Sequence, residues 1–417
     1  MGPRRLLADP ALVVIALLLS LYGIAMVYSA GQTDVLTPAA SAWRLQLQWL
    51  AVGLVAAFVV SRATMRFIEW AAVPAYFIML VVLVAMLKLG GGAGPAASSK
   101  SWLIIAGHRL GQPSELAKVI TVLMLARELA RFREPPRSLF DLWRAVLIVM
   151  VPCVLILAEH DLGSAIVLVP VLFAMLWWIG TDWRLLVLLA SPAVSLVLAF
   201  STGLWGAWFL LFLAIVFWYR PYLVESTSLV LANLAMGVVA PKLWERLAPY
   251  RQHRLLNFID PSFDPLRSGW HVMQSKVAIG SGGWLGKGYL GGTQKRLAFL
   301  PEQHTDFIFA VLGEELGFIG VLVALALFLL LLRRVVRIAS SASEPVGSLV
   351  AVGLGAVWLV HIIVNIGMTL NLMPITGIPL PFFSYGGSFM VSSWISIGIL
   401  ARIASEGRGA RTGEFAV

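Results

Sequence analysis

Residues 11–30 read ALVVIALLLSLYGIAMVYSA and contain no acidic or basic side chain. Crossing the hydrocarbon core of a bilayer takes about 20 apolar residues in a helix, because every backbone polar group must find its partner inside the protein there. The stretch follows Arg4 and Arg5 and so resembles a signal peptide, but its apolar run is longer than the roughly 7–15 residues of a signal core. It therefore predicts a first membrane span that is not cleaved.

The whole chain has the composition of a membrane protein. Of its 417 residues, 59% are hydrophobic and 12% are charged, about half the charged fraction of soluble domains. A soluble fold of this composition would expose large apolar patches. The net charge of +10 is spread between apolar runs, which indicates topology signals and contact with anionic membrane lipid, and argues against a nucleic-acid partner. The single cysteine, Cys153, excludes an intramolecular disulfide.

Apolar runs separated by polar breaks predict an all-α polytopic membrane protein that forms one domain over residues 1–417. The predicted spans cover 11–30, 46–61, 67–88, 112–128, 142–158, 163–180, 184–200, 204–218, 227–240, 306–332, 346–368 and 387–403.

Basic residues in the connections predict the orientation of these spans. Arg62, RELARFREPPR at 127–137, RRVVR at 333–337 and the tail after Ala401 all fall on one side, together with the N-terminus. Cytoplasmic connections are enriched in Lys and Arg, so this side should be cytoplasmic.

The loop at 241–305 lies on the opposite, outward side in this count. From Pro241 to Asp306 it carries nine Lys and Arg residues against five acidic residues. Long loops escape the orientation bias, so the charge can be without meaning. Alternatively, the loop handles a strongly anionic ligand outside the membrane, such as a lipid pyrophosphate. Both interpretations stay open at this point.

Ionisable residues at span ends are the next candidates. Glu115 and Lys118 lie three apart on one helical face in QPSELAK. They form either a self-neutralising ion pair or a lysine that faces a polar cavity and meets phosphate or carboxylate. Asp161 precedes the span at 163–180 and is either an N-cap or a functional carboxylate.

Two segments break the helical pattern. GSGGWLGKGYLGGTQ, at 280–294, lacks the strand and helix that flank a phosphate-binding loop, and it is expected to be a flexible outward loop. NLMPITGIPLPFFSYGGS, at 371–388, has three prolines and three glycines and cannot be one continuous helix. A broken or re-entrant segment of this kind is tolerated at membrane depth only beside a protein-lined cavity.

Five segments in this order resemble the SEDS family of polytopic proteins for shape, elongation, division and sporulation. They are QPSELAK, DLGSA, the outward loop with two Asp-Pro pairs, the run from QSKVAIGSGG to EELGFIG, and PITGIPLPFFSYGGS. The resemblance extends from the first span to about Arg402, and its most specific block, 274–320, favours the elongation-type members over the division-type members.

The resemblance implies a fold and a reaction. The fold has a ten-span core, to which the segment 184–240 adds two spans for a total of about twelve. The implied reaction is polymerisation of lipid II by a peptidoglycan glycosyltransferase at the outer face of the cytoplasmic (inner) membrane. The implied partner is a class B penicillin-binding protein that supplies the transpeptidase.

The resemblance also implies site residues. The family's essential aspartate corresponds to Asp264, in Asp264-Pro265 followed by Gly269-Trp270, and Asp260-Pro261 is the neighbouring decoy. A carboxylate at Asp264 would act as general base on the acceptor hydroxyl; without the resemblance, an aspartate that starts a turn before proline would be the simpler interpretation. The residues expected to bind substrate are Lys118, Glu115, Asp161, Arg267, Lys276 and His304.

This chain departs from the family pattern at two short motifs. Lys100-Ser101-Trp102 stands where the family often has Arg-Trp, so the role of that arginine has moved to Lys100 or is lost. Phe389 replaces a serine at the end of SYGGSF.

Three rival functions and one cofactor question remain open from the sequence. A flippase for the lipid-linked precursor would also use buried charges and a broken segment. A division-type polymerase and a scaffold for the penicillin-binding protein are the other two. No residues have the spacing of a metal site, although a divalent cation that bridges carboxylate and pyrophosphate needs no dedicated motif.

Overall fold

The computed structural model describes residues 8–34, 38–91, 101–105, 108–219, 222–246, 252, 268–297, 299 and 302–413. Its main helices are α1 (Pro10–Gly31), α2 (Ala42–Arg62), α3 (Met65–Leu89), α4 (Pro113–Leu129), α5 (Trp143–Ala158), α6 (Leu162–Trp178), α7 (Trp183–Leu198), α8 (Thr202–Tyr219), α9 (Leu223–Arg246), α13 (Ile308–Ser340), α14 (Pro345–Thr369) and α15 (Gly387–Gly413). Shorter elements connect them: η2 (Pro38–Ser41), η4 (Phe140–Leu142), α11 (Ser268–Gly282) and α12 (Thr293–Arg296).

Each of the twelve predicted spans coincides with one of the main helices. Among the described helices, nine are long and apolar enough to cross a membrane, and α6 and α7 are apolar but shorter. Helix α4 is neither long enough nor apolar enough for such a crossing, because it has only 17 residues and four of them are charged. The prediction of an all-α, multi-pass membrane protein is confirmed; the exact number of spans stays a prediction.

Capping explains where several helices begin. Asp9 precedes Pro10 and accepts a hydrogen bond from Leu12 N at 3.1 Å, which starts α1. Asp161 does the same for Ser164 N at 3.0 Å, which starts α6. In both cases the carboxylate satisfies a backbone N–H that the first turn of a helix leaves unpaired.

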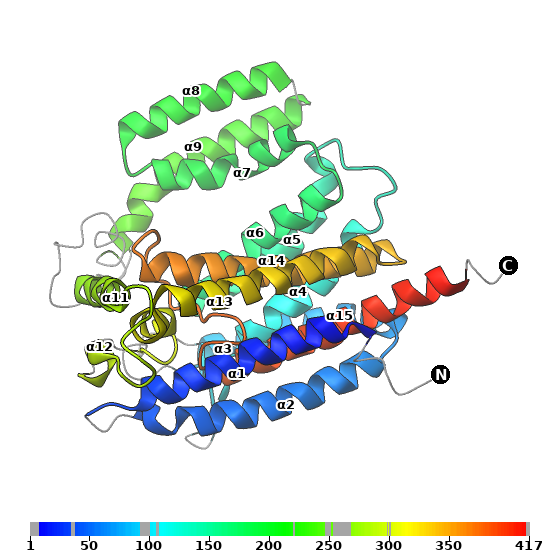
Figure 1. Ribbon diagram of the computed structural model, residues 1–417. Helices are drawn as coiled ribbons and strands as arrows, with labels where there is room; N and C mark the ends of the chain where they lie inside the picture. Colours follow the sequence, from blue (N-terminus) through cyan, green and yellow to red (C-terminus); the bar gives the residue numbers. More distant parts are fainter. Residues whose placement is uncertain are drawn as a thin grey trace.

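Helices α14 and α15 form the centre of the bundle. In an apolar stretch of 18 residues, 72% of the residues of α14 and 78% of those of α15 are buried, compared with 6% of those of α8. Helix α15 packs along α2, and α14 packs on α13, α6 and α4. In Figure 1, α7, α8 and α9 stand together at one side of this bundle, while both termini lie at one end and α11 and α12 lie at the other.

A short hairpin follows α3 and was not predicted. Strands β1 (Leu103–Ile105) and β2 (His108–Gly111) pair antiparallel, with Ile105 opposite His108. Its second strand leads directly into the start of α4, so it lies at the same end of the bundle as α11.

The glycine-rich segment does not form a flexible loop, so that expectation is wrong. Lys287 N donates to Glu314 O at 3.0 Å, and Phe318 N donates to Gly283 O at 2.9 Å, which ties the segment to α13. Helix α13 is interrupted at Gly317, which has φ +61° and ψ −160°, a conformation that is essentially restricted to glycine. A Cβ at Gly317 would collide with the backbone nitrogen of Gly286.

Buried charges complete this contact. Glu314 Oε1 accepts from Lys287 Nζ at 2.7 Å and from Thr293 N at 2.8 Å. Lys295 and Glu315 form an ion pair in which both side chains are inaccessible to solvent. Backbone contact at glycines and these two ion pairs therefore hold the segment rigidly against α13, and we call residues 282–297 the glycine cap.

Replacing Gly317 by alanine should disrupt the glycine cap. The added Cβ meets backbone rather than a flexible side chain, so we expect Gly317→Ala to lower stability by more than about 2 kcal/mol. Thermal unfolding in detergent measures the effect. Gly280→Ala is the matched control, because nothing lies within 4 Å of a Cβ at that position. Equal melting temperatures for the two variants would contradict the packing described here.

Candidate functional site

Residues 374–379 of the broken segment between α14 and α15 make no helical hydrogen bonds, and a single turn follows in which Ser384 N donates to Leu380 O at 3.0 Å. Side chains of α14 pair backbone carbonyl groups of the non-helical part. Asn365 Nδ2 donates to Ile378 O at 2.7 Å and to Asp306 O at 3.1 Å. His361 Nδ1 lies 2.9 Å from Pro379 O. Unpaired carbonyl groups are costly inside a membrane protein, so these two polar residues allow a non-helical chain to lie at this depth.

Helix α2 and the loop before α13 hold the far end of the same segment. Gln46 is buried; its Nε2 donates to Ser384 O at 2.9 Å, and its Oε1 accepts from Gly386 N at 3.1 Å. Tyr385 N donates to His304 O at 2.9 Å. The amide of Gln46 thus pairs two backbone groups, and the broken segment is fixed from both sides. The prediction of a broken segment at 371–388 is confirmed, and the cavity expected beside it stays a prediction.

Lys118 lies at the centre of a closed cluster. Its Nζ is 2.8 Å from Glu115 Oε2 and 2.9 Å from His361 Nε2. The ring of Phe389 covers the ammonium with its centroid at 5.2 Å, a cation–π contact. Only 1% of the Lys118 side chain and 5% of the Glu115 side chain are exposed. The structure therefore has a buried ion pair, with no exposed surface of Lys118 for a ligand.

The partners of His361 determine its tautomer. A carbonyl oxygen only accepts, so Nδ1 carries the proton that is donated to Pro379 O. An ammonium only donates, so Nε2 accepts from Lys118. His361 is therefore a neutral imidazole that links the charge on α4 to the backbone of the broken segment. Its ring stacks on Phe389, with centroids 4.3 Å apart and planes at 19°.

Asp161 connects the starts of α4 and α6. Besides capping α6, it accepts from Gln112 Nε2 and from Ser114 Oγ through Oδ2, the latter at 3.1 Å. The N-cap interpretation is confirmed, and the second oxygen serves the neighbouring helix. Gln112 N donates to Ser388 Oγ at 2.9 Å, which brings the first turn of α15 to the same place. The starts of α4, α6 and α15 therefore meet beside the broken segment.

Of the other residues predicted to act in catalysis or substrate binding, the structure describes Lys276 and His304. Lys276 is exposed on α11, and His304 is half-buried next to the ring of Tyr385, 5.4 Å away between centroids. Burial lowers the pKa of His304, while Glu302 acts in the opposite direction. Asp264 and Arg267 lie outside the described residues, as does Lys100.

His361, Asn365 and Gln46 are the residues that the sequence analysis missed. Each is a polar residue inside an otherwise apolar span, and that is the signal that would have identified them. Within the described part of the chain, no three His, Cys, Asp or Glu residues are close enough to hold a metal ion.

Comparison with known proteins agrees with this arrangement of motifs. The model of the FtsW, RodA and SpoVE cell cycle proteins matches residues 10–220 and 201–409. The chain belongs to this family. The peptidoglycan glycosyltransferase MrdB of Escherichia coli K12 is 36% identical over 395 residues, covering 95% of this chain and 93% of MrdB. The peptidoglycan glycosyltransferase RodA of Treponema pallidum is 33% identical, covering 95% of this chain and 97% of RodA.

Solved structures of the FtsW/RodA family share the fold. A chain of a peptidoglycan synthase complex that coordinates polymerization and crosslinking superposes with a TM-score of 0.70 and 25% identity, covering 96% of this chain and 98% of that one. The rod shape determining protein RodA of Thermus thermophilus superposes with a TM-score of 0.62 at 23% identity, covering 95% of this chain and 96% of RodA. The helical arrangement is therefore that of the family over nearly the whole chain.

Glu159 is a further buried carboxyl group at this end of the bundle. It follows α5, its side chain is inaccessible, and neither carboxyl oxygen has a hydrogen-bond partner among the described residues. Burial raises the pKa of Glu159 to about 8, and the charge on Asp161 adds to this. The group is therefore largely protonated at neutral pH.

Breaking the buried ion pair between Lys118 and Glu115 should lower the free energy of unfolding far more than breaking an exposed ion pair. Lys118→Met leaves Glu115 buried without its partner, a loss of about 3–5 kcal/mol, and adding Glu115→Gln should recover part of it. Thermal unfolding of the single and double variants gives the coupling. Arg137→Met removes a pair with Glu134 in which 85% of the arginine side chain and 76% of the glutamate side chain are exposed, and should cost under about 1 kcal/mol. If the loss of stability in the double variant equalled the sum of the losses in the two single variants, the coupling would be contradicted.

The raised pKa of Glu159 predicts a pH dependence of stability. Between the ordinary value of 4.5 and about 8, the folded protein binds a proton that the unfolded chain has lost, so stability falls as pH rises through this range. Glu159→Gln cannot ionise and should lack this dependence. Melting temperatures measured from pH 5 to pH 9 test this prediction. As pH rises, the melting temperature of the wild type should fall relative to that of Glu159→Gln. A difference between the two that is constant with pH would refute the assignment.

Proposed function

We infer that this chain is a peptidoglycan glycosyltransferase of the elongation type that polymerises lipid II. The observation that carries the inference is its similarity to MrdB and RodA over nearly the full length of both chains. Relatives described as the division-type FtsW are also similar, at 32% identity for that of Trichlorobacter lovleyi. The motifs in the 274–320 block support the elongation type.

We propose that Asp264 is the general base of the reaction. The acceptor hydroxyl attacks the anomeric carbon, the bond from that carbon to the pyrophosphate oxygen breaks, and the hydroxyl proton passes to the carboxylate. A positioned base contributes about 10²–10⁴-fold to such a transfer. A single displacement inverts the anomeric carbon, which converts an α-linked donor into a β-linked product.

The packing of α11 supports this role for the loop. The helix begins four residues after Asp264, and its Ser275 Oγ donates to Thr369 O at 2.8 Å. Ala278 packs on Phe307 and Ala310 at the start of α13. The segment that follows Asp264 is therefore anchored to α13 and α14, beside the broken segment.

Cationic side chains of the loop are the proposed ligands of the pyrophosphate. Arg267 precedes α11 in the sequence, and Lys276 is an exposed residue in the second half of that helix. Fixed positive charge stabilises the negative charge that develops on the leaving group. His304, which is neutral through burial, can donate or accept a hydrogen bond there.

The buried cluster of Glu115, Lys118 and Asp161 supports a second kind of contribution. These residues hold the starts of α4 and α6 against the broken segment, and a pyrophosphate could meet Lys118 only after the ammonium left one of its partners. We therefore propose that they first position the outward face of the site, and that direct substrate contact by them requires rearrangement.

We propose that the end with the termini is cytoplasmic and that the glycine cap and α11 lie outside the cytoplasmic (inner) membrane. The basic residues near Arg334 at the terminal end support this orientation (Figure 1). The proposed partner is a class B penicillin-binding protein with transpeptidase activity, because a similar chain belongs to a synthase complex that couples polymerization to crosslinking.

The decisive test is polymerisation of lipid II by the purified protein with its transpeptidase partner. Asp264→Asn should lower polymerisation by at least about 100-fold, as expected for loss of a general base. Asp260→Asn, four residues earlier, is the matched control and should remain active. Both variants should insert and bind the partner normally.

Two results would reject the proposal. Full activity of Asp264→Asn would remove the assigned base. Transfer of labelled lipid II across vesicles by the wild type without polymer formation would favour a flippase over a polymerase.

A further inference from the structure

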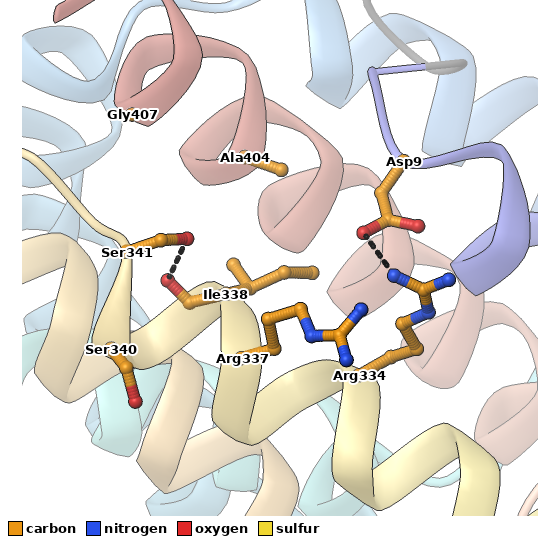
Figure 2. Close-up of a pocket in the computed structure, with 8 residues that line it drawn as sticks. All are labelled: Asp9, Arg334, Arg337, Ile338, Ser340, Ser341, Ala404 and Gly407. Carbon is orange, nitrogen blue, oxygen red and sulfur yellow. Dashed lines mark hydrogen bonds and ion pairs between the residues drawn. The ribbon is translucent and has the colours of Figure 1, made fainter. Parts of the chain in front are cut away.

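The bundle end that carries both termini contains a cavity of about 330 Å³. It lies where the start of α1 meets the last turns of α13 and α15 (Figure 2). The lining residues are Asp9, Arg334, Arg337, Ile338, Ser340, Ser341, Ala404 and Gly407. The cavity is thus at the opposite end of the molecule from the Lys118 cluster and α11, and the glycosyl transfer proposed above does not use it.

Positive charge dominates this cavity. Arg334 and Arg337 are three residues apart on α13 and therefore share one face, and Figure 2 shows both guanidinium groups extending into the space beside Asp9. Asp9 uses Oδ1 to cap α1, and its Oδ2 is 3.8 Å from Arg334 Nη1, longer than a hydrogen bond. Among the described residues, Arg337 has no hydrogen-bond or ion-pair partner for its guanidinium group.

A second hollow adjoins the first, with which it shares Arg334 and Arg337. Its volume is about 220 Å³, and Leu330, Arg333, Arg334 and Arg337 line it. Leu329 and Val336 on the same helix are 67% and 51% exposed. These apolar side chains belong in hydrocarbon. Because Val336 lies between Arg334 and Arg337, the arginines lie at the boundary between hydrocarbon and the lipid headgroups, where their long side chains reach the phosphates.

We propose that this arginine-lined cavity binds the phosphate of an anionic phospholipid from the leaflet on the side of the termini. The planar guanidinium fork fits two phosphate oxygens, and such charge-assisted hydrogen bonds are stronger than neutral ones. A phosphate would give Arg337 the partner that it lacks and would replace the loose contact between Arg334 and Asp9. The same phosphate chemistry occurs in free inorganic phosphate, but the exposed leucine and valine beside the arginines favour a ligand with acyl chains.

A phospholipid at this site would join three helices that are distant in sequence. The cavity is closed by the first residues of α1 and the last turns of α13 and α15. Bridging these ends should stabilise the folded state, because a ligand that binds only the folded protein raises its stability.

The test compares wild type and variants of the full-length protein in nanodiscs. One set of discs contains phosphatidylcholine alone, and the other contains phosphatidylcholine with phosphatidylglycerol. Phosphatidylglycerol should raise the melting temperature of the wild type. Arg334→Gln/Arg337→Gln should lose most of this rise and bind phosphatidylglycerol at least about tenfold more weakly by native mass spectrometry, as expected for loss of charge-assisted hydrogen bonds.

The matched control is Arg66→Gln/Arg133→Gln. Both of these arginines are exposed on the predicted cytoplasmic side and line neither hollow. This variant should keep the full effect of phosphatidylglycerol. An equal loss in both double variants would mean that general surface charge attracts the lipid, and it would overturn the proposal.

Two further arms complete the design. Should the double variant fail to fold, Arg337→Gln alone replaces it, because its loss leaves no partner unpaired; Arg337→Lys should show an intermediate effect, since it keeps the charge without the fork. Inorganic phosphate added to phosphatidylcholine discs separates the two sources of phosphate. Stabilisation by inorganic phosphate without an effect of phosphatidylglycerol would overturn the lipid assignment.

Discussion

The structure depends on pairing the backbone of a non-helical segment inside a membrane bundle. Residues 374–379, between α14 and α15, make no helical hydrogen bonds, and the hydrocarbon of a membrane offers no water to replace them. Asn365 and His361 of α14 pair backbone groups there instead, and Gln46 of α2 pairs those farther along the segment. Helices α2, α14 and α15 are consequently fixed around the broken segment, which explains why α14 and α15 are the most buried of the long apolar helices described.

The buried ion pair follows from the same constraint. With Nδ1 donating to Pro379 O, the neutral ring of His361 has Nε2 as an acceptor, and Lys118 donates to it. Lys118 then needs a counter-charge, which Glu115 provides one turn earlier. Buried ion pairs add little net stability compared with apolar packing, but they fix one arrangement strongly. The cluster therefore supplies specificity of helix placement at the end of the bundle where the proposed reaction occurs.

The sequence predicted elements whose signal is local. Apolar runs located all twelve main helices, prolines and glycines located the break at 371–388, and an aspartate before a span located the cap of α6. Partners distant in the chain were not predictable: Lys118 and His361 are 243 residues apart, and no local pattern pairs them. The segment 280–294 was expected to be flexible because it lacks the strand and helix of a phosphate-binding loop, whereas close approach to the backbone of α13 requires glycine at positions 282 and 286. Phe389 was recognised as a departure, but its contact with Lys118 became visible only in three dimensions.

The position of α7–α9 explains how a chain with this core accommodates added helices. The three helices share a small apolar cluster around Leu188, Phe212 and Leu229, and Asn233 joins α9 to α7 through Ser191 Oγ at 2.9 Å. Such polar contacts stabilise helix pairs within a membrane independently of the main core. The family model matches the chain in two parts that overlap at 201–220, within this group. In the proposed topology, two extra spans here return the chain to the same side of the membrane, so the orientation of α13, α14 and α15, and with it the proposed outward face of the site, is preserved.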